Sequence, residues 1–275
     1  CPVPLVVDAA HGAHLGLAPW LPGHMEGDAV ICSYHKTLPA LTQTAGVQVY
    51  DPLLVPKIKR YMDMYETSSP SYVLMNSVAK MAALVTEPAV FAPLQAGLQK
   101  LYELPLQHLR LIRADDPAKI NISTLHCNID GNVLADRLRA QGIEPEMSDR
   151  IHVICMATVG DTAAGFDLLA RALTEIDGTL APGSWPVAPL PLPPQHLQSW
   201  QVPPGEPLPL PQAVRRIACE TVVAYPPGVP MIVPGEEITQ AFVQAVQTAK
   251  NSGTVLHGTA GGGAERICCC VLTKD

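Results

Sequence analysis

The sequence lacks the features that mark membrane-spanning and nucleic-acid-binding proteins. No apolar run approaches the roughly 18 residues that a bilayer-spanning helix needs. Lysine and arginine, 18 residues in total, form no block, and the 25 acidic residues give a formal net charge of −7. A nucleic-acid site would need clustered positive charge. We therefore expect neither a membrane nor a nucleic acid as a partner, and the acidic balance mildly favours a cationic ligand.

Paired cysteines are also missing. The eight cysteines include no CxxC pair, and three of them are adjacent at Cys268 to Cys270. Neighbouring side chains on a strand point to opposite faces, so this triplet is poorly placed for a disulfide or a zinc site. The start of the chain shows no signal peptide and no initiator methionine. These features predict free thiols in a cytoplasmic protein whose chain begins within a longer one or after processing.

What is present indicates a compact α/β protein. Hydrophobic residues make up 48% and charged residues 16% of the 275 residues, as in a globular protein with real cores. We expect four parts: residues 1–105, a small α/β domain at 106–180, a proline-rich linker at 181–212, and a compact α+β domain at 213–275. Proline lacks the backbone N–H and fixes φ, which favours an extended connector in the third part.

Hydrophobic periodicity predicts the elements within these parts. The stretch 2–8 (PVPLVVD) is typical of a short buried strand in a mostly parallel sheet. Further strands are expected at 28–32, 45–50, 109–113, 119–124, 151–159 and around 267–272. Helices are expected at 70–85, 88–102, 132–141, 162–176 and 238–250, with Asp161 as the N-cap of the helix at 162.

Two short stretches place reactive side chains at expected strand ends. DAAHG begins at Asp8, and SYHK ends at Lys36. A pyridoxal phosphate site needs a lysine amine for the cofactor aldehyde and an anion against the pyridine nitrogen. Each residue alone is ordinary, because such a lysine is usually a surface charge and such an acid is usually a cap or turn former.

The combination of stretches carries more weight. DAAHGAHLG, SYHKTLPALTQ and ETSSPSYVLMNSVA, in this order, resemble the Orn/Lys/Arg decarboxylase family of the fold-type I pyridoxal-phosphate superfamily. The tail AVRRIACETVVAYPPGVPMIVPGEEIT is similar to the C-terminal domain of that family. The resemblance implies part of a fold-type I large domain in residues 1–105 and the family's C-terminal decarboxylase domain in 213–275. It also implies decarboxylation of arginine, lysine or ornithine to agmatine, cadaverine or putrescine.

The resemblance also implies roles for individual residues. Lys36 matches the lysine that binds pyridoxal 5′-phosphate covalently, and Asp8 matches the acid that pairs with the pyridine nitrogen. The other implied positions are Ala10 against one ring face, His11 beside the ring, and Ser33 and His35 near the phosphate. Ser68 and Ser69 match the segment that reaches the phosphate of a partner subunit in a homodimer or larger homo-oligomer. Glu220 is a candidate for the distal cationic group of the substrate, or else a surface carboxylate.

Only seven residues precede Asp8, whereas the large domain of the family has several strands and helices before this point, including a phosphate-binding loop. We therefore expect the chain alone to be an incomplete enzyme, inactive, and poorly folded in its first hundred residues. Two alternatives stay open. The chain could belong to another fold-type I enzyme, such as an aminotransferase or a lyase, or it could be a cofactor-free assembly module.

Overall fold

The computed structural model describes residues 3–185, 192–225, 228–251, 253–258 and 265–271. Its first part is a three-stranded sheet in the order β1-β2-β3. The strands are β1 (Val6–Asp8), β2 (Ala29–Ser33) and β3 (Ala45–Val49). β1 pairs with β2 in parallel, but β2 pairs with β3 antiparallel. The expectation of parallel strands is therefore confirmed for β1 and β2 and wrong for β3. β1 is also not buried: it lies at a sheet edge, and Val6 is 55% exposed.

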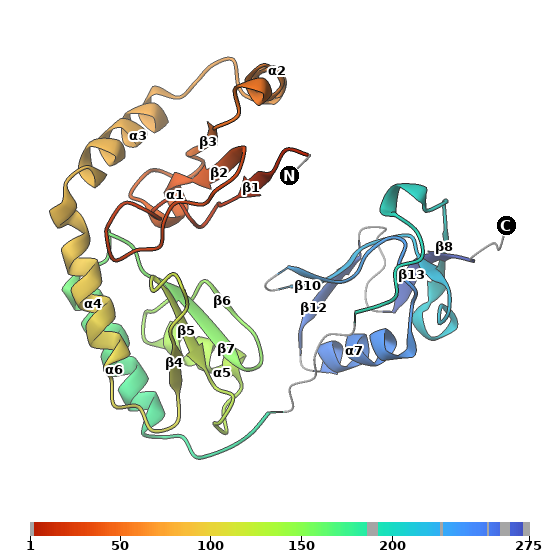
Figure 1. Ribbon diagram of the computed structural model, residues 1–275. Coiled ribbons are helices and arrows are strands. Elements are labelled where there is room, and N and C mark those ends of the chain that lie inside the picture. Colours follow the sequence, from red (N-terminus) through yellow and green to blue (C-terminus); the bar gives the residue numbers. More distant parts are fainter. Residues whose placement is uncertain (1–2, 186–191, 226–227, 252, 259–264, 272–275) are drawn as a thin grey trace.

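A short helix, α1 (Tyr34–Thr37), lies between β2 and β3. Longer helices follow the sheet, namely α2 (Val55–Tyr65), α3 (Tyr72–Val85) and α4 (Ala92–Tyr102), with short 3-10 turns at Pro52–Leu54 and Pro88–Phe91. α3 and α4 run along one side of the molecule (Figure 1). α3 confirms the helix expected at 70–85. Ser71 begins it, because its side chain accepts a hydrogen bond from the backbone N–H of Leu74. The sequence reasoning missed α2, which buries none of its residues.

The middle of the chain forms the small domain (residues 106–180), a four-stranded antiparallel sheet with two helices. The strands, in the order β4-β5-β7-β6, are β4 (Arg110–Ile112), β5 (Lys119–Ser123), β7 (His152–Met156) and β6 (Met147–Ser148). The helices are α5 (Gly131–Ala140) and α6 (Ala163–Asp177). Thr162, not Asp161, caps α6, because the Thr162 side chain accepts from Gly165 N–H. The Asp161 carboxylate instead accepts from the backbone N–H of Thr158.

The main hydrophobic core crosses the boundary expected at residue 105. Leu94, Leu98 and Leu101 of α4 are buried in the same cluster as Leu169 and Leu173 of α6. Leucines at i, i+4 and i+7 place one face of α4 against α6. In structural terms α4 therefore packs as part of the small domain, and the N-terminal sheet is the separate unit.

The last part contains two three-stranded antiparallel sheets and one helix. The sheets have the orders β8-β13-β9 and β11-β10-β12. The elements are β8 (Glu206–Pro209), β9 (Ile217–Ala218), β10 (Val222–Tyr225), β11 (Val229–Ile232), α7 (Gln240–Asn251), β12 (Val255–Gly258) and β13 (Arg266–Cys270), with 3-10 turns at Ser199–Gln201 and Leu210–Gln212. β8 lies within the proline-rich stretch expected to be a linker. Its prolines are tolerated because β8 is an edge strand.

Two expectations about the whole chain can be compared with the structure. In the described ranges no single helix is long and apolar enough to cross a membrane, although the bent pair Tyr72–Val85 and Ala89–Tyr102 passes that test of length and composition together. All seven cysteines within these ranges are free thiols, and five of them are buried. The prediction of free thiols is confirmed for these seven, and Cys1 lies outside the described residues.

Candidate active site

The ends of β1 and β2 bring Asp8 and Lys36 to one edge of the N-terminal sheet. Asp8 closes β1 and is paired in parallel register with Ile31 of β2. β2 continues to Ser33, after which the chain turns into α1, which carries Lys36. Because the carboxyl ends of parallel strands meet at the same edge of a sheet, residues that follow them converge there. Asp8 and Lys36 therefore lie at the same edge of the sheet, at the ends of neighbouring strands.

A cavity of about 420 Å³ opens at this edge. Four of the predicted site residues border it, namely Asp8, Ala10, His11 and Lys36. Ala9, Gly12, Leu15 and Met25 complete its wall. Room for a planar ring between the acid and the amine is the geometric condition that the predicted cofactor site imposes. Asp8 and Lys36 both border this one space, and their roles toward a cofactor stay predictions.

Local hydrogen bonds shape the loop that follows Asp8. The Asp8 carboxylate accepts from the backbone N–H of Ala10 at 3.0 Å, and Gly12 N–H donates to the carbonyl of Ala9 at 2.8 Å. These bonds fold the chain tightly behind the carboxylate. The negative charge also reaches the strand beside it: burial, and then the charge of Asp8, raises the pKa of the Cys32 thiol. The raised pKa keeps Cys32 a neutral thiol at neutral pH.

Ser33 and His35 flank Lys36 but do not border this cavity. Ser33 stands at the N-cap position of α1 and is half-buried, without a side-chain cap hydrogen bond. His35 Nδ1 lies 2.9 Å from the backbone carbonyl of Thr44. Since a carbonyl can only accept, Nδ1 carries the hydrogen in this bond. His35 therefore fixes the turn that presents Lys36, and its predicted place near a phosphate stays a prediction.

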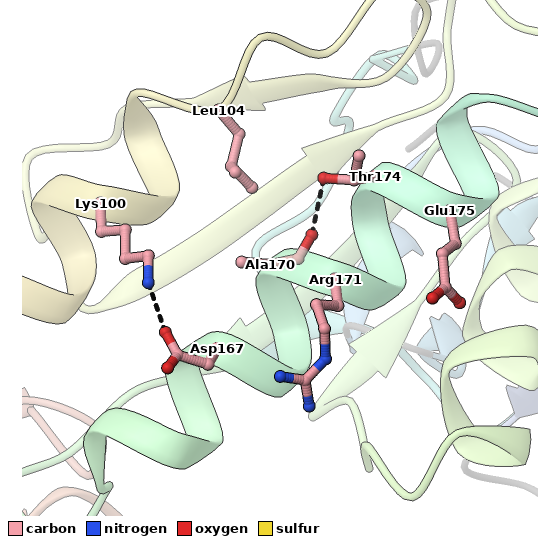
Figure 2. A pocket seen from close by; sticks show the side chains of 7 residues that line it. All are labelled: Lys100, Leu104, Asp167, Ala170, Arg171, Thr174 and Glu175. Atoms are coloured by element: carbon pink, nitrogen blue, oxygen red, sulfur yellow. Dashed lines mark hydrogen bonds and ion pairs between the residues drawn. The ribbon is translucent and has the colours of Figure 1, made fainter.

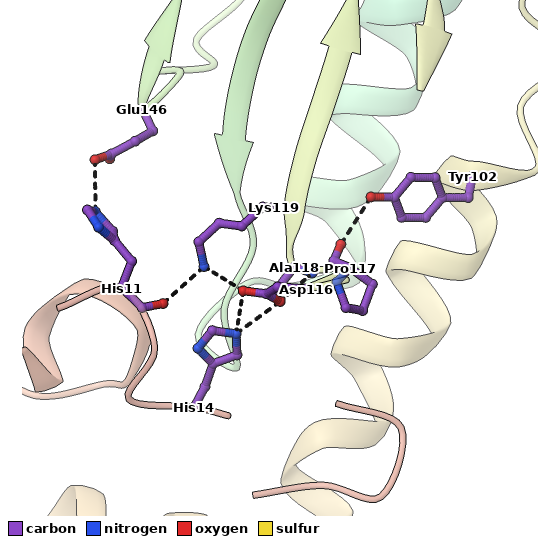
Figure 3. A network of polar contacts seen from close by, with 8 residues as sticks. All are labelled: His11, His14, Tyr102, Asp116, Pro117, Ala118, Lys119 and Glu146. Carbon is purple, nitrogen blue, oxygen red and sulfur yellow. Dashed lines mark hydrogen bonds and ion pairs between the residues drawn. The ribbon is translucent and has the colours of Figure 1, made fainter. Parts of the chain in front are cut away.

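Sequence reasoning missed one residue beside the site. Glu146 comes from the small domain, and its Oε1 lies 3.2 Å from Nε2 of His11 (Figure 3). The two residues are separated by 135 positions, and no local pattern in the sequence joins them. Only the packing of the small domain against the loop that carries His11 creates the contact.

The remaining predicted residues lie elsewhere. Ser68 and Ser69 are exposed in the loop between α2 and α3 and do not border the cavity. Glu220 is only 2% exposed, and one of its oxygens accepts the backbone N–H of Cys268 at 2.6 Å. It is thus not a surface carboxylate, which removes one of the two readings of this residue. A role toward substrate stays a prediction.

A larger cavity, of about 550 Å³, lies between α4 and α6 (Figure 2). An ion pair between Lys100 and Asp167 spans it, and the hydrogen bond from Lys100 lowers the pKa of Asp167. Thr174 uses its hydroxyl on the carbonyl of Ala170 within the same helix. This cavity is an open groove between two helices and contains none of the predicted site residues, so the smaller cavity at Asp8 is the better candidate.

The fold is that of solved basic-amino-acid decarboxylases. The lysine decarboxylase LdcF of Francisella novicida superposes with a TM-score of 0.72 at 15% sequence identity, over 96% of this chain and 53% of that one. At this identity the likeness shows the fold alone. It confirms the α/β class.

The sequence comparisons then give the family. The family model for the Orn/Lys/Arg decarboxylase major domain matches residues 1–92, and the model for the C-terminal domain of the same family matches residues 193–258. The chain therefore belongs to the Orn/Lys/Arg decarboxylase family. The second match also begins within the proline-rich stretch, ahead of the boundary expected at 213.

Two curated relatives are similar along most of the chain. The uncharacterized protein YaaO of Bacillus subtilis is 28% identical over 281 residues, which cover 93% of this chain and 58% of the relative. The arginine decarboxylase of Halalkalibacterium halodurans is 28% identical over 282 residues, which cover 93% of this chain and 57% of the relative. The chain thus spans little more than half the length of these relatives.

Proposed function

We propose that this chain carries the lysine and the acid of a pyridoxal-phosphate site that decarboxylates a basic amino acid. The observation that carries the proposal is the shared cavity, in which Asp8, Ala10, His11 and Lys36 face one space. The residue types fit the cofactor: Lys36 would hold its aldehyde and Asp8 its pyridine nitrogen, while Ala10 leaves room for a ring face. When bound, the cofactor supplies an electron-accepting ring for the bond broken at the substrate's α-carbon.

The side chains of this chain would bind, orient and hold protons around that ring. The Asp8 carboxylate would keep a hydrogen on the pyridine nitrogen, because an ionised acceptor strengthens such a hydrogen bond. The Lys36 amine would hold the cofactor and could carry a proton during the reaction. His11 would lie beside the ring, and its contact with Glu146 limits its rotation. Arginine, lysine and ornithine are all candidate substrates.

We propose further that the chain alone is inactive and that the active form is a homodimer with shared sites. α2 and α3 support a second copy as the partner. Together with the turn before α2 they expose a run of large apolar side chains, among them Tyr65 at 85% and Tyr72 at 81%. Ser68 and Ser69 lie between these two helices. A contact through the helices would carry both serines to a neighbouring subunit.

The cofactor proposal is tested by chemical trapping at Lys36. The 275-residue chain is mixed with pyridoxal 5′-phosphate, reduced with borohydride and mapped by peptide mass spectrometry. We expect the label on Lys36, and its loss in Lys36→Ala. Lys100→Ala is the matched control, because Lys100 is exposed and lies outside the cavity. Equal labelling of Lys36→Ala and wild type would contradict the proposal, and an unlabelled wild type would favour a cofactor-free module.

The reaction itself is tested in the same preparation. Release of labelled CO₂ from carboxyl-labelled arginine, lysine or ornithine would support decarboxylation, whereas an oxo acid product would favour an aminotransferase. Turnover by the chain alone at a normal enzymatic rate would overturn the proposal that it is inactive.

The homodimer is tested by sedimentation at several protein concentrations. The double variant Met64→Ser, Tyr65→Ser is expected to raise the dimer dissociation constant at least about tenfold, because exposed aromatic and methionine side chains anchor interfaces. Trp200→Ser is the matched control, since Trp200 is 82% exposed in the C-terminal part. A chain that stays monomeric at all concentrations, or an equal effect of the control, would contradict the dimer.

A further inference from the structure

A polar network joins the loop of residues 9–15 to the small domain (Figure 3). His14 Nε2 lies 3.1 Å from Oδ2 of Asp116, and Lys119 Nζ donates to the same oxygen at 2.8 Å. Lys119 Nζ also donates to the backbone carbonyl of His11 at 3.1 Å. His11 closes the network through Glu146. His11 and His14 belong to the loop that follows β1, whereas Asp116, Lys119 and Glu146 belong to the small domain. The network therefore connects the N-terminal part of the chain to the small domain.

Asp116 is the centre of this network. Its other oxygen, Oδ1, accepts the backbone N–H of Ala118 at 3.0 Å, which fixes the carboxylate ahead of β5. Burial alone would raise the pKa of Asp116, but the hydrogen bonds from His14 and Lys119 outweigh burial and lower the pKa to about 2. The group is therefore a carboxylate at neutral pH and can only accept. It follows that His14 carries a hydrogen on Nε2.

His14 depends on this partner, because it is only 2% exposed. Its Nδ1 is buried without a hydrogen-bond partner in the described residues, so within these residues the ring depends on Nε2 and its contact to Asp116. A buried polar group that loses its partner costs the full desolvation of that group. Without the carboxylate, moving the loop outward to hydrate His14 becomes favourable.

The same loop lines the candidate cofactor cavity through Ala10 and His11. We propose that Asp116 is a positioning residue of this site: through His14 and Lys119 it holds residues 9–15 against the small domain and so sets the place of His11 in the cavity. The role of the cavity rests on the proposed function, but the hold on the loop does not. The small domain thereby shapes a site to which it contributes Glu146 but no residue of the cavity wall.

The experiment compares Asp116→Asn with Asp115→Asn by hydrogen exchange of the 275-residue chain. Asp115 is the matched control: it is the exposed neighbour, and its substitution removes the same charge. We expect the amides of residues 9–17 to exchange at least about tenfold faster in Asp116→Asn, because a hydrogen bond to a charged group is lost. The amides of β5 and α6 should keep their wild-type rates, and Asp116→Glu should restore part of the protection.

A second readout measures the site itself. Titration with pyridoxal 5′-phosphate should give a dissociation constant at least about tenfold higher for Asp116→Asn than for wild type, with Asp115→Asn unchanged. The positioning role is overturned if residues 9–17 keep their exchange rates, if the control changes equally, or if all segments accelerate together as in global destabilisation. Should Asp116→Asn not fold, Lys119→Met removes the other arm of the network and must give the same local acceleration.

The two proposals fail separately. A wild-type chain that binds no cofactor at Lys36 contradicts the proposed function, while the exchange rates of residues 9–17 still decide whether Asp116 holds the loop. Conversely, normal cofactor labelling with an unchanged loop in Asp116→Asn contradicts the positioning role alone.

Discussion

The N-terminal region and the small domain differ in how much of their apolar surface is buried. Seventeen of the 25 large apolar side chains that the structure reports as exposed lie between Val3 and Leu84. The buried cluster of the sheet contains only Ala9, Val30 and Cys32. The small domain, with α4, encloses a continuous core that includes Leu134 and Leu173. Large exposed apolar patches are typical of interaction sites, so the sheet together with α2 and α3 is where the proposed partner is expected to bind.

The comparison also explains where the candidate site lies. Asp8 and Lys36 come from the sheet, whose packing is sparse, and the contacts that order the loop between them come from the small domain. A sheet of three short strands has little independent stability. The well-packed domain therefore supplies rigidity to a site whose reactive groups it does not carry.

The largest expected effect lies in the core of the small domain. Leu173→Ala in α6 should lower the free energy of unfolding by about 2–5 kcal/mol, because it leaves a cavity among fully buried side chains. Val133→Ala on α5 is the matched control, since Val133 is 48% exposed and should change stability by less than about 0.5 kcal/mol. Urea unfolding measures both. Equal effects of the two variants would contradict the tight packing of the small-domain core around Leu173.

An intermediate effect is expected at Asp177, the last residue of α6. Its carboxylate is 4% exposed and accepts the backbone N–H groups of Gln107, His108 and Leu109 at 2.6, 2.9 and 2.7 Å. Burial alone would raise the pKa of Asp177, but these three bonds lower it below its ordinary value. The carboxylate thereby joins the segment before β4 to the end of α6 through hydrogen bonds.

The sign of the pH dependence follows from this lowered pKa. The stabilisation is present above the ordinary aspartate pKa and is lost as the pH falls through the lower pKa of the folded state. Asp177→Asn should therefore be less stable at pH 7 by about 1–3 kcal/mol and should show a flatter loss of stability below about pH 4. Asp136→Asn, at a 76% exposed side chain, is the control. An acid profile of Asp177→Asn that parallels wild type would remove this role.

Much of the fold was predictable from the sequence, because local chemistry determined it. The apolar spacing of α3, α4, α5 and α6 is visible in the sequence, and the glycine and proline punctuation that separates the elements is equally plain. The cap of α6 was misassigned to Asp161 because two neighbouring residues could both cap, and only the backbone geometry selects Thr162. α2 was missed because it buries none of its residues, so no buried apolar face marks it in the sequence.

In the candidate site, too, residues set by local motifs could be predicted, whereas residues brought in by packing could not. Asp8, Ala10, His11 and Lys36 were predictable, because they follow strands that pair in parallel and belong to motifs of the family. Glu146 and Asp116 were not, since their contacts span 135 and 102 positions and arise only when the small domain packs on the loop. The proline-rich stretch misled for a related reason. Its prolines exclude a central strand but not the edge position that β8 takes beside β13.

The smallest effect on stability is expected on the exposed face of the sheet region. Leu53 is 85% exposed in the turn before α2. Leu53→Ser should change the free energy of unfolding by less than about 0.5 kcal/mol at low protein concentration, because the side chain is already in water. At high concentration a dimer through α2 and α3 would cover Leu53, and the variant should then unfold more readily than wild type. If Leu53→Ser lowered the free energy of unfolding by more than about 0.5 kcal/mol at every protein concentration, Leu53 would belong to the chain's own core. That result would remove the contrast between the two regions.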